Sequence, residues 1–236
     1  IKFQENMIFL INILGADHAG YIKRISAAVN ALSKKNNILT CKVCQLVKLI
    51  KNGEPYKMSK RKGDFITIKD VLNEVGRDSL RFMMLSRGND IELDFDFNKV
   101  LEKNKENPVF YVQYCYARIN SLYTSINIKP NKIKKIQKSK FSPNDYEYKL
   151  LRKIIEWPKV VDSSAKKLEP HRIPFFLYEL ATIFHSYWSK GNEDPEFKFI
   201  VSGKIKNELT FKIFQLITII LTNAMFILGV SLPKKM

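Results

Sequence analysis

The stretch YKMSKRKGDF contains two lysines that could bind a phosphate group together. Lys57 and Lys60 are separated only by Met58 and Ser59, so a tight loop could direct both ammonium groups and the Ser59 hydroxyl at one anion. Gly63 would let such a loop bend. Cations placed where charge develops on a leaving pyrophosphate stabilise the transition state of nucleotidyl transfer. The alternative is a solvated basic turn, and the spacing by itself leaves both interpretations open.

A second candidate is the loop GADH, which contains Gly15 and Asp17 and follows the apolar run MIFLINIL. Such a run predicts a buried parallel strand, and ligands of open α/β sheets bind at the carboxyl ends of the strands. Gly15 would allow close approach of the backbone, and the Asp17 carboxylate could accept hydrogen bonds from a ribose diol. Asp17 could equally be the N-cap of the following helix.

Strand and helix patterns alternate around these two loops. AGYIKRISAAVNALSKK has apolar residues at helical spacing, and CKVCQLVKLI is typical of the next strand. Thr67 and Asp70 form a capping-box pattern at the start of a further helix, which should end at Gly76. These elements predict an α/β part that covers residues 1–76.

The pattern changes near Arg77. RDSLRFMMLSR indicates a helix, NDIELDFDF alternates like a short strand or an extended connector, and nearly everything after Asn98 has the helical repeat. We therefore expect a second, all-α part at residues 77–236, with residues 77–98 as its connector.

Composition and charge favour a soluble globular protein with a polyanionic partner. The 236 residues are 45% hydrophobic, and the net charge of +17 points to nucleic acid. The three cysteines indicate a reducing compartment, and no targeting signal is recognised, so a cytoplasmic protein is expected. Cys41 and Cys44 lie in a β-rich run in which residues three apart point to opposite faces, so we expect no metal site.

One segment is long enough to span a membrane. Residues 213–232 are 20 residues without a charge. However, Gln215, Thr218 and Thr222 fall on one side of a helix, and the stretch closes with Gly229. A buried, slightly amphipathic C-terminal helix is therefore predicted, and no membrane contact.

The helical part contains an aromatic stripe that could contact RNA. In NPVFYVQYCYARINSL, an apolar stripe of Val112, Cys115, Ile119 and Leu122 should face the core. Tyr111, Tyr114 and Arg118 form a second stripe, rotated by about 100°. Aromatic and Arg side chains stack on unstacked bases. Partly buried packing tyrosines are the alternative.

Three further features receive mainly structural interpretations. Leu177, Ala181, Phe184 and Trp188 recur at helical spacing, as in a core-facing helix. His171 and His185 are expected to be hydrogen-bonded structural residues. The segment 129–140 carries six lysines and no acid, which indicates a solvated loop or, alternatively, a loop that faces phosphates.

Several of these stretches together resemble one enzyme family. YKMSKRKGDFITIKDVLNEVGRDSLRFMML resembles the KMSKS signature of a class I aminoacyl-tRNA synthetase running into a DALR-type anticodon-binding domain, with residues 78–81 as the naming letters. GADHAGYIKR, NPVFYVQYCYARINSL and the ending LGVSLPKKM are similar to arginyl-tRNA synthetases in particular. The resemblance covers essentially the whole chain, and the motifs occur in the order of the family.

The resemblance implies a fold and a set of site residues. The fold would be the C-terminal part of a Rossmann-like class I catalytic domain, followed by an all-α anticodon-binding bundle. The residues that would bind ATP are Gly15, Asp17, Met58, Ser59 and Lys60, with Lys57 and Lys60 as the catalytic pair. The residues that would contact the anticodon are Tyr111, Tyr114, Arg118, Trp188 and Met236.

The resemblance also implies a reaction, and it indicates which part of the enzyme this chain does not contain. A monomeric arginine–tRNA ligase would use ATP, with Mg²⁺, to activate arginine and would transfer it to its tRNA. A HIGH-type motif does not occur in this sequence, so the chain should be the C-terminal part of such an enzyme and inactive alone. Arg61 replaces the usual final Ser of the signature and leaves both lysines in place. The alternative is a free-standing tRNA-binding module without ligase activity.

Overall fold

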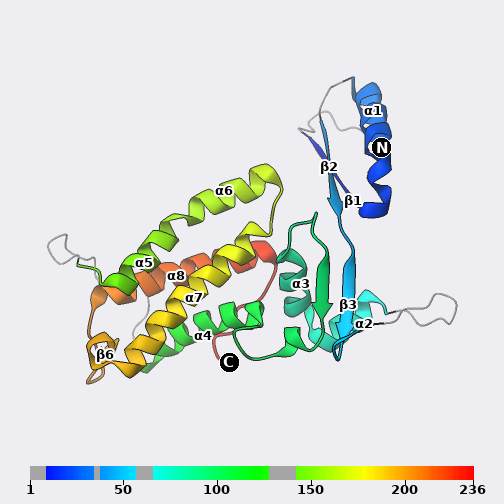
Figure 1. Ribbon diagram of the computed structural model, residues 1–236. Helices are drawn as coiled ribbons and strands as arrows, with labels where there is room; N and C mark the ends of the chain where they lie inside the picture. Colours follow the sequence, from blue (N-terminus) through cyan, green and yellow to red (C-terminus); the bar gives the residue numbers. More distant parts are fainter. Residues whose placement is uncertain (1–8, 35–37, 57–65, 128–141) are drawn as a thin grey trace. The chain divides into compact units, whose positions relative to one another are not determined.

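The computed structural model describes residues 9–34, 38–56, 66–127 and 142–236 (Figure 1). These residues form two compact units. The first unit comprises Ile1–Lys57 and Arg87–Asp96, and the second comprises Met58–Ser86 and Phe97–Met236. The predicted connector is thus divided between the units, because residues 87–96 join the first one. The domain boundary between residues 76 and 77 remains a prediction.

The first unit has two small sheets and one long helix. Its elements in chain order are β1 (Leu10–Gly15), the 3₁₀ helix η1 (Ala16–Tyr21), α1 (Ile22–Ser33), β2 (Leu39–Cys44), β3 (Val47–Lys51), β4 (Glu54–Pro55) and β5 (Leu93–Asp96). β1 and β2 pair in parallel, as expected of a strand–helix–strand unit. β3 pairs in parallel with β5 and antiparallel with β4.

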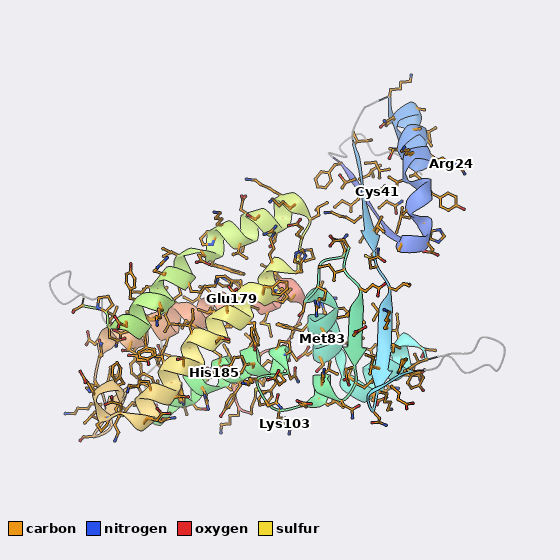
Figure 2. The ribbon with its side chains drawn as sticks, viewed as in Figure 1. Arg24, Cys41, Met83, Lys103, Glu179 and His185 are labelled. Atoms are coloured by element: carbon orange, nitrogen blue, oxygen red, sulfur yellow. The ribbon has the colours of Figure 1, made fainter. Side chains whose placement is uncertain are left out.

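The single strand predicted from CKVCQLVKLI is wrong, because the structure divides it into β2 and β3. The ladder of β2 ends at Cys44, and the next amide, that of Gln45, donates a hydrogen bond to the Asn89 carbonyl 2.8 Å away. β3 then belongs to a different sheet. Cys41, labelled on β2 in Figure 2, is half-buried. Cys44, at the end of the same strand, is exposed.

The second unit is mostly helical, and the short antiparallel pair of β6 and β7 departs from the all-α prediction. Its elements are α2 (Ile68–Val75), α3 (Arg77–Leu85), η2 (Lys99–Leu101), α4 (Pro108–Ser125), α5 (Asp145–Ile155), α6 (Trp157–Lys167), α7 (Arg172–Glu193), η5 (Pro195–Phe197), β6 (Ile200–Val201), β7 (Lys204–Ile205) and α8 (Glu208–Leu228). The start of α2 confirms the capping box, since Thr67 and Asp70 exchange both expected bonds. Gly76 ends this helix at φ 77°, a value that favours glycine.

The core of the second unit lies among α4, α5, α7 and α8. The predicted apolar face of α4 is confirmed: Val112, Cys115 and Ile119 are fully buried, and Leu122 is partly buried against the same core. α8 is long and apolar enough to span a membrane, but half of its most apolar window is buried within the unit. Phe211 and Phe214 on α8 are completely buried in this core. α8 therefore packs as a core helix.

A buried carboxylate joins three helices of this unit. Glu147 is completely buried at the start of α5 and completes a capping box with Asn144. Its Oε2 accepts the Asn144 amide at 3.0 Å. Its Oε1 accepts the Thr210 hydroxyl, the Asn207 side-chain amide at 3.2 Å and the Tyr187 hydroxyl at 3.4 Å. Glu147 thus connects α5 to α7 and to the start of α8 without a cationic partner among the bonds to its described neighbours.

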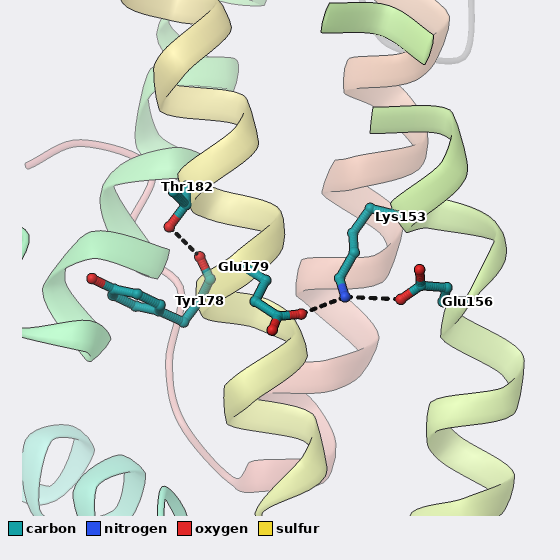
Figure 3. A network of polar contacts seen from close by, with 5 residues as sticks. All are labelled: Lys153, Glu156, Tyr178, Glu179 and Thr182. Atoms are coloured by element: carbon teal, nitrogen blue, oxygen red, sulfur yellow. Dashed lines mark hydrogen bonds and ion pairs between the residues drawn. The ribbon is translucent and has the colours of Figure 1, made fainter. Parts of the chain in front are cut away.

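An ion-pair network connects two of these helices, α5 and α7, nearer the surface (Figure 3). Lys153 on α5 bonds to Glu156, the residue after that helix, at 2.8 Å and to Glu179 on α7 at 2.5 Å. The Glu179 side chain is 62% exposed. The Lys153 side chain is only 14% exposed, but solvent reaches both acidic partners and screens the ion pairs. We therefore expect a contribution of about 0–1 kcal/mol, less than that of the Glu147 cluster.

Candidate nucleic-acid interface

The proposed ATP residues are only partly within the described chain. Gly15 ends β1 in ordinary extended conformation, and a Cβ there would lie 2.6 Å from the Asp17 carboxylate. The Asp17 side chain is 78% exposed and lies 3.5 Å from His18. Asp17 stands inside η1 and is not a helix N-cap, so that alternative is wrong. Its exposed carboxylate is free of the backbone bond that an N-cap makes.

The rest of the predicted phosphate loop lies outside the described residues. This applies to Lys57, Met58, Ser59 and Lys60. The ATP site therefore stays a prediction.

The start of α4 is held firmly by Asn107. This N-cap residue is only 4% exposed, and its side-chain amide donates to the carbonyls of Val100 and Glu102, each 2.8 Å away. Its side-chain oxygen caps the helix by accepting the Phe110 amide, and Pro108 occupies the first turn. The aromatic stripe of α4 thus extends from a fixed helix start.

A pocket of about 410 Å³ brings four of the five predicted anticodon residues together. It is lined by Tyr114, Ala117, Arg118, Ser121, Trp188, Lys235 and Met236. None of these described lining residues is acidic, and two are cationic. The pocket therefore combines aromatic faces with hydrogen-bond donors and positive charge, which suits an unstacked nucleotide.

Arg118 is the central side chain of this pocket. Its guanidinium carbon lies 4.1 Å from the centre of the Tyr114 ring and 5.4 Å from that of the Trp188 ring. Cation–π contacts of this kind hold a guanidinium against aromatic faces. Trp188 also packs on Phe184 and Phe199 of the core. The pocket wall is therefore anchored in the core, as the core interpretation of this α7 face predicts.

His185 on α7, labelled in Figure 2, contacts both Arg118 and Tyr111 of α4. Arg118 Nη1 lies 3.1 Å from His185 Nδ1, and His185 Nε2 lies 3.0 Å from the Tyr111 carbonyl oxygen. A guanidinium can only donate, so Nδ1 accepts and Nε2 carries the proton that it donates to Tyr111. His185 is thus hydrogen-bonded within the packed unit, as predicted, and it is neutral in this arrangement.

The Tyr111 ring packs against aromatic side chains of α7 and not into the pocket. Its ring lies 4.3 Å from the His185 ring and 5.5 Å from the Tyr178 ring, and it does not line the pocket. Contact between Tyr111 and RNA therefore stays a prediction. His171, at the start of α7, lies edge-on to Phe175.

Three pocket residues were missed from the sequence: Ala117, Ser121 and Lys235. Ser121 lies three residues after Arg118 on α4, so extending the stripe by one turn would have found it. Lys235 precedes Met236 in a segment without helical periodicity, and no pattern in the sequence indicates it.

His185 should make the stability of the second unit depend on pH. Burial, opposed by the bond to Tyr111 and reinforced by the Arg118 charge, lowers the pKa of His185 from 6.5 to about 4. The unfolded chain therefore binds the proton first, so stability is complete above pH 6.5 and falls as the pH drops toward about 4. The expected loss is roughly 3 kcal/mol. It can be measured by urea unfolding across this range.

The control for this experiment is His185→Asn, which cannot titrate. The difference in the free energy of unfolding between wild type and this variant should shrink as the pH falls. A difference that is the same at all pH values would contradict a buried neutral histidine.

Comparison with known families identifies the class of this protein. The DALR anticodon binding domain family matches residues 112–236, which is more than half of the chain and includes the whole pocket. The chain belongs to this family.

The relatives that match the chain over its whole length are arginyl-tRNA synthetases, and the chain matches their C-terminal region. The chain is 52% identical over 235 residues to the arginine–tRNA ligase of Pelagibacter ubique and 45% identical over 241 residues to that of Ruegeria pomeroyi. In each comparison the whole chain is covered, but only 41% of the relative. The chain thus spans less than half the length of the curated relatives that it matches.

Solved structures agree with this relationship. A Campylobacter jejuni protein described as an arginyl-tRNA synthetase superimposes with a TM-score of 0.84 at 33% identity. The match covers 97% of this chain and 48% of that one. The Thermus thermophilus arginyl-tRNA synthetase shares the fold, with a TM-score of 0.66 at 17% identity over 97% of this chain and 41% of that one.

Proposed function

We propose that the chain is the C-terminal part of an arginine–tRNA ligase and binds the anticodon loop of the tRNA for arginine. The observation that carries this proposal is the pocket in which Tyr114, Arg118 and Trp188 meet, in a unit that belongs to an anticodon-binding family. An unstacked base would stack on the aromatic rings, and Arg118 and Lys235 would attract the phosphates. The net charge of +17 supports the same partner.

The catalytic role belongs to the complete enzyme. Together with an upstream region that supplies a HIGH-type motif, Asp17 would hold the ATP ribose, and Lys57 and Lys60 would stabilise the departing pyrophosphate. The arginine carboxylate would attack the α-phosphate, and the arginyl group would then pass to the tRNA. ATP would enter with Mg²⁺, and the enzyme would act as a cytoplasmic monomer.

The exposed side of β1 supports an incomplete catalytic fold. Phe9, Ile11 and Ile13 are 55%, 46% and 69% exposed, and they alternate with half-buried residues. Parallel strands are normally covered on both faces. Further elements of a longer enzyme would cover this apolar face.

Removal of the Tyr114 ring tests the binding proposal. We expect Tyr114→Ala to weaken binding of an arginine-accepting tRNA about 10- to 100-fold, because base stacking on one aromatic side chain contributes roughly 1–3 kcal/mol. Binding can be measured by fluorescence anisotropy of a labelled tRNA. The unfolding midpoint should change little, since Tyr114 is only half-buried.

The matched control is Tyr148→Ala, which removes a 55% exposed tyrosine that does not line the pocket. Its tRNA affinity should equal that of the wild type. Equal binding by the Tyr114→Ala variant and the wild type would rule out the pocket as the tRNA site.

A further inference from the structure

The segment that follows α8 is held in place by polar contacts with α3 and α4. α8 ends at Gly229, which adopts φ 66°, and the Val230 amide bonds back to the Met225 carbonyl at 2.9 Å. This closes the helix and turns the chain away from its axis. The remaining residues, 230–236, are called the tail.

Asp78 on α3 binds the tail at Ser231. Its Oδ2 accepts the Ser231 amide at 3.2 Å and also the Ser231 hydroxyl. Gln113 on α4 donates from Nε2 to the Ser231 carbonyl at 3.0 Å and to Asp78 Oδ2 at 3.4 Å. Ser231 is therefore bonded through its amide, its carbonyl and its side chain.

Arg81, one turn further along α3, secures the end of α8. Its Nε donates to the Leu228 carbonyl, one of the carbonyls that a helix end leaves without a partner. The guanidinium lies over Gly229 so closely that a Cβ there would be 2.6 Å from Nε. Glycine at this position thus provides both the left-handed turn and the space for Arg81.

Asp78, Arg81 and Gln113 are together called the clamp. The clamp and the pocket are connected by α4 on one side and by the tail on the other. Gln113 directly precedes Tyr114, while Lys235 and Met236 line the pocket beside Tyr114 and Arg118. The chain end lies next to α4 (Figure 1). The tail therefore runs from Ser231, where the clamp binds it, to the pocket at Met236. These five residues can span at most about 17 Å when extended.

The clamp contacts lie at the surface and not in the core. Ser231 and Arg81 are exposed, and Asp78 is half-buried. Exposed hydrogen bonds add little to the free energy of folding, but fixing a segment removes the entropy that a bound ligand would otherwise have to overcome. Contacts of this kind are therefore suited to holding the tail in one position.

We infer that Asp78, Arg81 and Gln113 are positioning residues for tRNA binding, because they hold the tail so that Lys235 and Met236 complete the pocket. This inference rests on the proposed function. Asp78 and Arg81 are the first and last residues of the motif that resembles DALR. By this inference they position Lys235 and Met236, which lie far from them in the sequence and form one wall of the pocket.

A double-variant cycle tests the inference. Asp78→Ala should weaken binding of an arginine-accepting tRNA transcript about tenfold, the factor expected when roughly one residue must be ordered on binding. Deletion of residues 234–236 should weaken it at least as much, because it removes Lys235 and Met236 from the pocket. The combination should bind as weakly as the deletion alone, because the clamp acts only through the tail. Asp78→Asn, which keeps an acceptor oxygen, should restore part of the affinity.

A second readout does not depend on tRNA. Trypsin should cleave after Lys234 and Lys235 faster in the Asp78→Ala variant than in the wild type, while the unfolding midpoint stays the same. Wild-type affinity of Asp78→Ala, or losses that multiply in the combination, would overturn the inference. If Tyr114→Ala weakens binding and Asp78→Ala does not, only this inference fails. If neither does, the proposed function fails.

Discussion

Replacement of Glu147 by alanine is expected to destabilise the helical unit by roughly 3–5 kcal/mol, a large part of the 5–15 kcal/mol that is typical of a domain. The carboxylate is completely buried and accepts bonds from the Asn144 amide, Thr210 and Asn207. Alanine would leave the buried Thr210 hydroxyl and the half-buried Asn144 amide without this acceptor, and each orphaned buried group costs about 1–3 kcal/mol. The capping box of α5 would also be lost.

Two further variants isolate this effect. Glu147→Gln keeps one acceptor oxygen for Thr210 and Asn207 but cannot accept the Asn144 amide as well, so we expect an intermediate loss of about 1–2 kcal/mol. Glu179→Ala removes the partly exposed partner of Lys153 (Figure 3) and should cost about 0–1 kcal/mol. Urea unfolding followed by circular dichroism measures all three. A Glu147→Ala variant as stable as Glu179→Ala would show that the buried cluster adds nothing.

Lys60→Ala should slow arginine-dependent exchange between ATP and pyrophosphate about 10²- to 10³-fold, the usual loss when one charge-stabilising group is removed. The physical reason is that the Lys60 ammonium would face the negative charge that develops on the departing pyrophosphate. The assay requires a complete enzyme. A chimera in which this chain replaces the matching 41% of the Pelagibacter ubique ligase supplies one.

The control for Lys60 is Lys69→Ala, which removes the same charge from an exposed position on α2. Its exchange rate should match that of the unsubstituted chimera, and tRNA binding should be unchanged in both variants. An unchanged rate in Lys60→Ala would exclude this lysine from the mechanism. A chimera that binds tRNA but never ligates arginine would favour the free-standing binding module.

The helical part of the fold was largely readable from the sequence. The capping box at Thr67, the helix from Arg77 and the buried stripe of α4 all follow from residues three or four positions apart. Such patterns are local, so the chain encodes them without reference to distant parts. The strand assignment at residues 41–50 failed because the division between two sheets depends on pairing with Asn89 and β5, which lie far along the chain.

The sequence by itself determined the family, the basic charge and the residue types that could stack on bases. Only the tertiary structure decided that Tyr114, Trp188 and Met236 share a pocket while Tyr111 packs against His185. It also decided that Glu147 is buried and that Asp78 binds the tail. These outcomes depend on which helix faces meet across long sequence separations, and packing of whole helices, not local spacing, sets those contacts.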